Sequence, residues 1–286
     1  MKAFIGVKNM VEIDDFFNKI ICGDSIEVIK GIPDNSIDVI VTSPPYYDLK
    51  NYDDIKNIVG EDYHKWMIQV CKEVSRILKP DASFILNIKD RVNDGVRGTK
   101  LYRLIDDICT ETNMKLIDTH IWFKTNGISM SSQGIIDRWE PLFWLSKTNK
   151  PRVFINACRT KHKRSTVERV KYKVSKNNQY LRDEYIKLNE TGSLPKNVIV
   201  TSVGTHRFIP GQRHPAVFPE KIPIFYIKLL SRENDVVLDP FVGSGATAVA
   251  CKKMSRRFIG IDISEKYCDI ARKRLANIPE KLEGWL

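Results

Sequence analysis

The sequence predicts an α/β fold in which a doubly wound sheet of parallel strands is assembled from both ends of the chain. Short runs rich in β-branched residues alternate with segments whose apolar residues recur at helical spacing. Such alternation favours parallel pairing with right-handed crossovers. A strongly basic stretch, at about residues 147–204, interrupts the pattern, and 286 residues are enough for one large domain that carries such an insertion.

In the first half of the chain, turn residues and helical spacing mark where each element begins and ends. Strands are predicted over 19–22, 37–41, 83–88, 115–123 and 141–145. One helix is predicted over 63–78, because its apolar residues keep helical spacing until Pro80 ends the pattern. A second helical face is formed by Leu101, Leu104, Ile105 and Ile108.

After the basic stretch the same alternation resumes. Helices are predicted over 223–230, 246–254 and 265–275, and strands over 236–238 and 258–263. The second half of the chain therefore supplies further strands and helices of the same kind as the first.

The composition excludes several classes of protein. Hydrophobic residues at 42% and charged residues at 28% are proportions of a folded globular chain. No apolar run approaches the roughly 20 residues of a membrane span, and the N-terminus lacks the apolar region of a secretory signal, so we expect a cytoplasmic protein with no membrane partner. The six cysteines lack the spacing of a disulfide scaffold and are expected to be reduced. Cys158 and His162 have no second pair at ligand spacing, so no metal site is expected.

The net charge of +11 is concentrated in one segment. Residues 147–187 contain 13 Lys and Arg against 3 Asp and Glu, which is ten of the eleven net charges. Such a segment is typical of a surface that binds a polyanion, although a solvated basic loop has the same composition. Interleaved aromatic residues favour a folded binding module. The candidate polyanion contacts are Lys161, Lys163, Arg164, Arg169, Lys171 and Lys173.

A glycine turn after the strand 236–238 predicts a cofactor site. Asp239 follows that strand, Gly243-Ser244-Gly245 opens the next helix, and Asp262 ends the next strand, where a carboxylate can accept both hydroxyls of a ribose. Glycines needed only for close packing are the alternative. The turn has neither the third glycine of a dinucleotide site nor the lysine of a P-loop. A nucleoside without a phosphate chain is therefore favoured, and S-adenosylmethionine is the commonest such cofactor.

A second turn, Thr42-Ser43-Pro44-Pro45-Tyr46, follows the strand 37–41 and predicts chemistry on an amine. Two consecutive prolines fix φ and donate no hydrogen bond, so the carbonyls beside them are held rigid and can accept. An exocyclic amine could give its two N–H bonds to the Ser43 hydroxyl oxygen and the Pro44 carbonyl while Tyr46 stacks on the base. An ordinary turn after a strand is the alternative.

Together these segments resemble the DNA amino-methyltransferases of the permuted β class, in which the catalytic half precedes the cofactor half. Thr42-Ser43-Pro44-Pro45-Tyr46 is similar to their catalytic motif, and Asp239-Pro240-Phe241-Val242-Gly243-Ser244-Gly245 to their cofactor loop. The resemblance covers 19–146 and 205–276 and implies a Rossmann-like S-adenosylmethionine-dependent methyltransferase sheet, circularly permuted in motif order. It implies a catalytic half over 1–146, an inserted target-recognition region over 147–204 and a cofactor-binding half over 205–286.

The resemblance also implies which residues form the site. Gly23-Asp24-Ser25 resembles the loop whose acid holds the adenine amine of the cofactor, and the strand and loop Ile121-Trp122-Phe123-Lys124 with Asn126 resemble the lining of the base pocket. Ala246 departs from the Thr that is usual in the family, a change expected to matter little. The implied catalytic residues are Ser43, Pro44, Pro45 and Tyr46. The implied cofactor-binding residues are Asp24, His214, Pro215, Asp239, Phe241, Gly243, Ser244, Gly245 and Asp262.

The residue before Pro-Pro indicates the base. Family members with Ser at this position resemble N4-cytosine enzymes, whereas N6-adenine enzymes usually have Asp or Asn there, and no cysteine follows a proline as C5-cytosine chemistry would need. The prediction is site-specific N4-cytosine methylation of duplex DNA, with the base flipped out of the stack, protecting DNA from a cognate restriction enzyme. The alternatives are N6-adenine methylation and a non-catalytic nucleic-acid-binding protein on the same fold.

Overall fold

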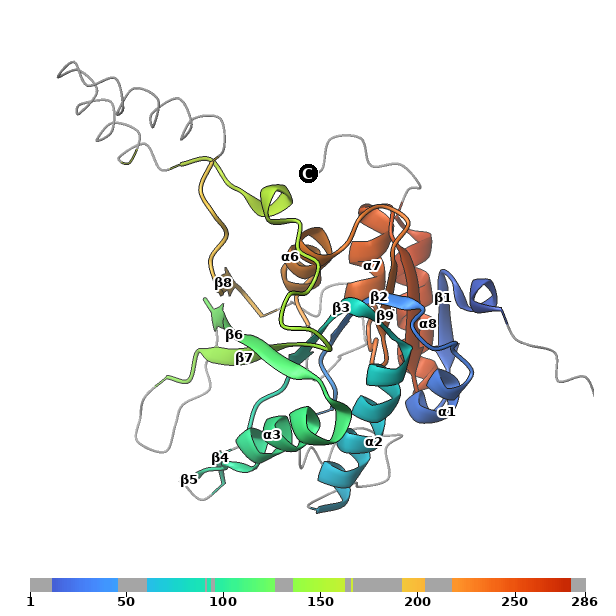
Figure 1. Ribbon diagram of the computed structural model, residues 1–286. Helices are drawn as coiled ribbons and strands as arrows, with labels where there is room; N and C mark the ends of the chain where they lie inside the picture. The colour runs from blue at the N-terminus through green and yellow to red at the C-terminus, as the bar shows by residue number, and fades with distance from the viewer. Residues whose placement is uncertain are drawn as a thin grey trace, which may run out of the picture.

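An eight-stranded sheet with helices on both faces forms the protein (Figure 1). The computed structural model describes residues 12–45, 61–90, 92–93, 96–126, 136–162, 166, 192–203 and 218–278. In chain order the elements are η1 Ile13–Phe16, β1 Lys19–Cys22, α1 Ser25–Lys30, β2 Ile37–Thr42, α2 Glu61–Ile77, β3 Leu78–Asn87, β4 Val92–Asn93, β5 Val96–Arg97, α3 Lys100–Thr112, β6 Lys115–Lys124, β7 Trp139–Ser146, η2 Ile155–Cys158, β8 Val198–Thr201, α6 Lys221–Leu230, β9 Val236–Asp239, α7 Ala246–Lys253, β10 Arg257–Asp262 and α8 Glu265–Ala276.

The predicted strands and helices are all present, with bounds that shift by a few residues. Helix α1 was not predicted, because its six residues are too few to show a helical period. Its start is nevertheless well defined, because Asp24 accepts hydrogen bonds from the amides of Ile26 at 2.8 Å and Glu27 at 3.1 Å. Asp24 is therefore the N-cap of α1.

The order of strands in the sheet is β1-β10-β9-β2-β3-β7-β6-β8. The first five are parallel neighbours, as predicted, so the two halves of the chain meet where β2 pairs with β9 through Val39↔Val237 and Ile40↔Leu238. Strand β7 differs from the prediction, since it runs antiparallel to both β3 and β6. The chain returns from β6 to β7 without a described crossover helix, which antiparallel neighbours do not need.

Strand β8 comes from the range predicted to be an insertion, yet it belongs to the main sheet. It pairs in parallel with β6, with Trp122 opposite Ile199 and Lys124 opposite Thr201. The sheet therefore takes its edge strand from within 147–204. The division into 1–146, 147–204 and 205–286 stays a prediction.

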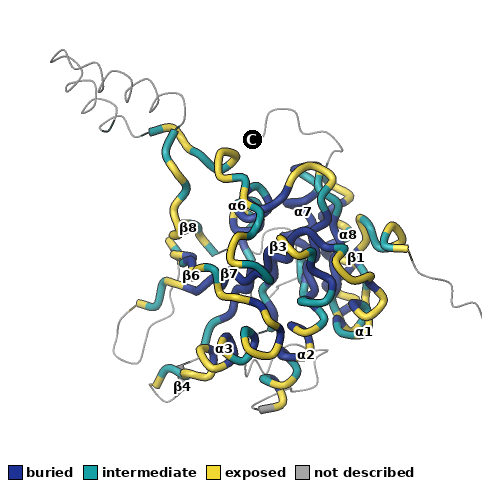
Figure 2. The backbone as a smooth tube through the Cα atoms, viewed as in Figure 1, coloured by how far each residue is buried: buried dark blue, intermediate teal, exposed yellow. Residues whose placement is uncertain are grey.

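Two hydrophobic cores lie on opposite faces of the sheet, and Figure 2 shows the central strands, among them the fully buried β2 and β9, between them. Helices α1, α2 and α3 pack with Ile40 of β2 on one face. Helices α6, α7 and α8 pack with Val39 and Val41 on the other. Successive strand side chains point to opposite faces, so a strand covered on both faces is apolar throughout. This explains the almost uninterrupted apolar composition of β2.

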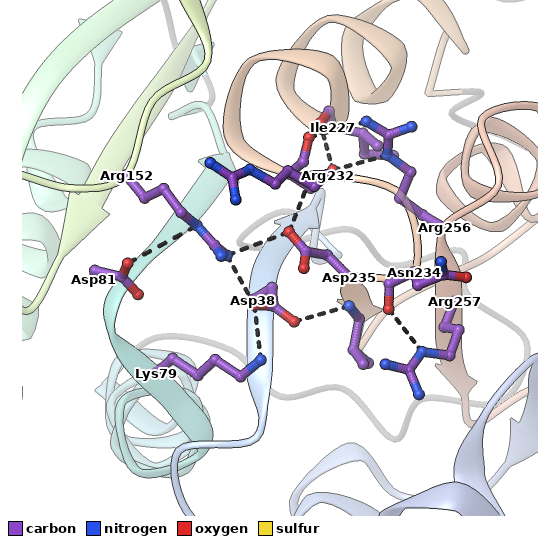
Figure 3. A network of polar contacts seen from close by, with 12 residues as sticks. Asp38, Lys79, Asp81, Arg152, Ile227, Arg232, Asn234, Asp235, Arg256 and Arg257 are labelled. Atoms are coloured by element: carbon purple, nitrogen blue, oxygen red, sulfur yellow. Dashed lines mark hydrogen bonds and ion pairs between the residues drawn. The ribbon is translucent and has the colours of Figure 1, made fainter.

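A buried acid, Asp38, joins three strands near their amino ends (Figure 3). Only 1% of Asp38 is exposed, and it accepts hydrogen bonds from Lys79 at 2.8 Å, from Arg152 at 2.8 Å and from the amide of Val236 at 2.9 Å. Burial alone would raise the pKa of Asp38, but these three bonds outweigh it and hold the pKa below its usual value. Arg152, one of the 13 cations counted between 147 and 187, thus neutralises an acid of the sheet.

All six cysteines are free thiols, as expected. Cys71, Cys251 and Cys268 are buried, and burial raises the pKa of each of these thiols. Among the helices that the structure describes, none has the length and apolar character required to cross a bilayer.

Candidate active site

Four predicted site residues lie at one edge of the sheet. Asp24 follows β1, Asp262 ends β10, Asp239 ends β9 and Ser43 follows β2, and these four strands are parallel neighbours. The carboxyl ends of parallel strands meet at the same edge, which is where ligands bind in open α/β sheets. The sheet topology therefore brings the cofactor turn and the Ser-Pro-Pro turn together, although they are about 200 residues apart in the chain.

The glycine turn between β9 and α7 has a fixed shape. Gly243 and Gly245 have φ values of +47° and +86°, a region that glycine adopts without strain. A side chain on Gly245 would place its Cβ 2.9 Å from the Cβ of Ala271, so this glycine is needed for the packing of α7 against α8. Arg274, which is 9% exposed, donates to the carbonyl and hydroxyl oxygens of Ser244. Packing thus explains Gly245, as the alternative interpretation of the motif allowed.

Asp262 orients its carboxylate by two hydrogen bonds from the backbone. Its Oδ2 accepts from the amide of Gly243 at 2.9 Å, and its Oδ1 accepts from the amide of Ser264 at 3.0 Å. The residue is half-buried, and a carboxylate is an acceptor of the kind that ribose hydroxyls require. The bond from Gly243 also ties the carboxylate to the glycine turn.

The composition of this edge fits S-adenosylmethionine. Asp24 is exposed and Asp262 is half-buried, at the ends of adjacent strands, and the turn Gly243-Ser244-Gly245 contains no Lys or Arg. Carboxylates accept hydrogen bonds from amine and hydroxyl donors, whereas phosphates need donors and cations. The donor and acceptor chemistry therefore matches a nucleoside that carries a positive sulfonium group rather than a phosphate chain.

Asp239 links the two turns directly. Its Oδ1 accepts from the hydroxyl of Thr42 at 2.6 Å and from the amide of Phe241 at 3.1 Å, and its Oδ2 accepts from the hydroxyl of Thr247 at 2.7 Å. Burial raises the pKa of Asp239 to about 6, although these hydrogen bonds act in the opposite direction. The end of the catalytic strand is thus tied to the start of the cofactor turn, and a contact of Asp239 with the cofactor stays a prediction.

The Ser-Pro-Pro turn leaves the sheet beside β3. Ser43 is half-buried, Pro44 is buried and Pro45 is half-buried. The residue before this turn, Thr42, is opposite Leu86 in the pairing of β2 with β3. The turn is therefore anchored in the sheet at the residue before Ser43.

The strand predicted to line a base pocket, β6, ends at the same edge. Trp122 is 3% exposed and donates its ring N–H to the carbonyl of Thr201 at 3.2 Å. Lys124 forms an ion pair with Glu140, and its ammonium lies 4.8 Å from the Trp122 ring centroid. Asn126 accepts from the amide of Val203 at 2.8 Å. That this strand and Asn126 line the base pocket stays a prediction.

Several predicted residues are outside the described part of the chain. These are Tyr46, Lys163, Arg164, Arg169, Lys171, Lys173, His214 and Pro215. Of the candidate polyanion contacts, Lys161 is described and is exposed. Thr247 and Arg274 were not predicted to have a role, because a Thr or Arg inside a helix has no local pattern that indicates a partner distant in sequence.

Comparison with known proteins identifies the family. A family model described as DNA methylase, of the N6 and N4 type, matches residues 37–273. The chain belongs to this DNA methylase family. As a member of this family, the protein is an enzyme that acts on DNA and depends on S-adenosylmethionine, and both predicted motifs lie within the matched range.

Relatives of this DNA methylase cover most of its length. M.BglII of Bacillus subtilis, a Type II methyltransferase, is 30% identical over 264 residues, which are 92% of this chain and 70% of that protein. The PvuII DNA methyltransferase of Proteus hauseri, described as cytosine-N4-specific, has a TM-score of 0.69 at 24% identity over 91% of this chain and 88% of that chain. The protein TTHA0409 of Thermus thermophilus, solved in complex with S-adenosyl-L-methionine, has a TM-score of 0.61 at 21% identity over 90% of this chain and 93% of that chain. The two solved structures share the fold of this DNA methylase, which confirms the predicted fold.

Proposed function

We propose that this protein methylates the exocyclic N4 amine of cytosine at specific sites in duplex DNA. The proposal rests on the position of Ser43. This residue, followed by two prolines, lies at the carboxyl end of β2, and β2 pairs with the cofactor strand β9. A neutral hydroxyl before Pro-Pro is what the family resemblance associates with cytosine. The similarity to the cytosine-N4-specific PvuII enzyme supports the same base.

The proposed chemistry is a direct transfer to a positioned amine. The hydroxyl oxygen of Ser43 and the carbonyl oxygen of Pro44 each accept one N–H of the amine, so its lone pair leaves conjugation with the ring and points away from both acceptors. The same oxygens stabilise the positive charge that develops on the nitrogen. S-adenosylmethionine, when bound, supplies an electrophilic methyl group. The methylated nitrogen is acidic and releases its proton afterwards, so no strong base is required.

The DNA must present a base outside its stack. The N4 amine of cytosine is not accessible within a duplex, and enzymes that modify bases flip the nucleotide out at a cost of a few kcal/mol. In our proposal Tyr46 stacks on the flipped base. The basic residues from Lys161 to Lys173 hold the phosphates, which position the duplex without reading its sequence.

A protective role is part of the proposal. Type II methyltransferases such as M.BglII have names that imply a restriction system, and we propose that a cognate endonuclease recognises the same site. The protein would then act in the cytoplasm on the DNA of its host. We expect host DNA to resist that endonuclease, and we expect this resistance to be lost when the gene of the methyltransferase is deleted. Digestion of DNA from both strains would test the proposed role.

The identity of the product tests the proposed function. We expect purified protein, incubated with labelled S-adenosylmethionine and unmethylated genomic DNA, to yield N4-methylcytosine when the digested nucleosides are separated by mass spectrometry. N6-methyladenine as the product would overturn the assignment of the base. Binding of S-adenosylmethionine and DNA without transfer would instead favour a non-catalytic nucleic-acid-binding protein.

Asp262→Asn should weaken the binding of S-adenosylmethionine about tenfold, because hydrogen bonds to a charged acceptor are worth roughly twice those to a neutral one. The amide keeps the size of the side chain and one acceptor oxygen. Titration calorimetry would measure the affinity. Asp269→Asn on the exposed surface of α8, where Asp269 pairs with Arg272, is the matched control and should bind as the wild type does. Equal affinity of the two variants for S-adenosylmethionine would contradict the assignment of Asp262 to the cofactor site.

A further inference from the structure

A tyrosine from helix α2 holds the far end of the Ser-Pro-Pro turn. The hydroxyl of Tyr63 donates to the carbonyl oxygen of Pro45 at 2.7 Å, and Tyr63 itself is only 3% exposed. Helix α2 packs on one face of the sheet, so this bond joins the turn to the core. The carbonyl of Pro45 belongs to the peptide that leads to Tyr46.

The turn is thereby held at both ends. Thr42, before Ser43, donates to Asp239, and Pro45, after Pro44, accepts from Tyr63. Between the two anchors lie only Ser43 and Pro44, whose oxygen atoms are the proposed acceptors of the target amine. Proline fixes its own φ, so little backbone freedom remains between the two anchors.

Both anchors lead to the cofactor loop. Asp239 is its first residue. The second anchor, Tyr63, reaches the loop through two aromatic contacts. The ring centroids of Tyr63 and Trp66 lie 5.6 Å apart, those of Trp66 and Phe241 lie 5.3 Å apart, and the rings of each pair are tilted by 53°. Such tilted contacts between rings are favourable and restrict how the rings can shift. A continuous set of contacts therefore runs from the carbonyl of Pro45 through α2 to the loop that binds the cofactor.

We propose that Tyr63 is a positioning residue for methyl transfer, which sets the Ser43 and Pro44 acceptors relative to the cofactor loop through Trp66 and Phe241. The proposal rests on the proposed roles of Ser43 and Pro44, but it does not depend on whether the base is cytosine or adenine. A displacement of about 1 Å at reacting atoms can cost a large factor in rate, and Tyr63 acts on that distance without touching the substrate.

Tyr63→Phe removes the hydroxyl and keeps the ring contacts. With cofactor and DNA saturating, we expect the single-turnover rate of methyl transfer to fall about tenfold, because the Pro45 carbonyl loses its donor. The affinity for S-adenosylmethionine should stay within about twofold, since the tilted ring contacts with Trp66 remain. A fall in rate with unchanged cofactor affinity separates positioning from a general loss of the site.

Tyr226→Phe is the matched control. Tyr226 is also buried, and its hydroxyl bonds to the Nδ1 atom of His120 at 2.9 Å on the opposite face of the sheet. The control thus loses a buried tyrosine hydroxyl and its hydrogen bond elsewhere, and both variants should lower the melting temperature by similar amounts. We expect Tyr226→Phe to keep the wild-type transfer rate. Equal slowing of the two variants, or no slowing of Tyr63→Phe, would overturn the proposal.

Two further readouts keep this test separate from the test of the base. The methylated nucleoside formed by the wild type identifies the base, whereas the rate ratio of Tyr63→Phe to wild type has the same meaning for either product. Hydrogen exchange at the amides of Thr42 and Ser43 requires no activity and should be faster in Tyr63→Phe than in Tyr226→Phe. Unchanged exchange in Tyr63→Phe would contradict the positioning role even if the product were the expected one.

Discussion

Ser43→Ala is expected to reduce turnover about a hundredfold or more, comparable to the loss of one preorganised polar group that stabilises transition-state charge. The alanine removes the acceptor for one N–H of the target amine, so the lone pair of that amine stays in conjugation with the ring. Steady-state and single-turnover rates on unmethylated DNA would measure the loss. The affinity for S-adenosylmethionine should be nearly unchanged, because Asp24 follows β1 and Asp262 ends β10, and neither of these strands is a neighbour of β2 in the sheet.

Ser36→Ala provides a control at the other end of the same strand. Ser36 directly precedes β2, and its hydroxyl donates to the carbonyl of Pro33 at 2.6 Å. Both substitutions remove a serine hydroxyl next to β2, but only that of Ser43 lies at the edge where the cofactor strands end. A wild-type rate for Ser43→Ala, or a comparable loss for Ser36→Ala, would contradict the role assigned to Ser43.

The sheet and its carboxyl edge were predictable because their determinants are local in the sequence. A strand such as β2 can be predicted from its mainly apolar composition. A turn such as Gly243-Ser244-Gly245 can be predicted from its glycines, because few other structures require glycine. Parallel strands then place their following residues at one edge whatever the chain order. Ser43 and Asp262 could therefore be proposed as site residues from their own local sequence, whereas Asp24 was proposed only through the resemblance to the family.

The contacts that hold the site together were not predictable from the sequence. Tyr63 lies in the first turn of a helix, where its side chain has no feature that indicates the carbonyl of Pro45 as its partner. The position of β8 in the sheet was also hidden, since Val198–Thr201 is short and follows a long stretch without a described strand. The charge of Arg152 appeared to belong to the basic segment, whereas a partner distant in sequence, Asp38, neutralises it. Each of these depends on a pairing between distant residues, which a single sequence does not record.

Asp239 should make the stability of the protein depend on pH in an unusual direction. Burial raises its pKa from 3.8 to about 6, so the native state binds this proton more tightly than the unfolded state does. The resulting stabilisation is fully present below the unfolded pKa and is lost as the pH rises through about 6. A shift of about two pKa units corresponds to about 3 kcal/mol, of which about 2 kcal/mol should be lost between about pH 4.5 and 7.5.

The comparison with Asp239→Asn isolates this contribution. An asparagine does not titrate, and its amide can donate to Thr247, whose hydroxyl can then donate to the carbonyl of Val41, 3.3 Å away. We therefore expect the difference in unfolding free energy, wild type minus variant, to fall by about 2 kcal/mol between about pH 4.5 and 7.5 in urea titrations. A difference that does not change with pH would show that Asp239 titrates normally in the native state.

Asp38 supplies a control of opposite sign, since it is as buried as Asp239 but has charged partners. Only 1% of Asp38 and 4% of Asp239 are exposed, yet Lys79 and Arg152 lower the pKa of Asp38, whereas Asp239 meets hydroxyls and an amide. The stabilisation from Asp38 is therefore present above its unfolded pKa and is lost as the pH falls through the lowered native pKa. The difference between wild type and Asp38→Asn should rise as the pH increases up to about 4, whereas the difference for Asp239→Asn should fall between about pH 4.5 and 7.5. Parallel slopes for the two variants would mean that burial alone, and not the charge of the partners, governs both acids.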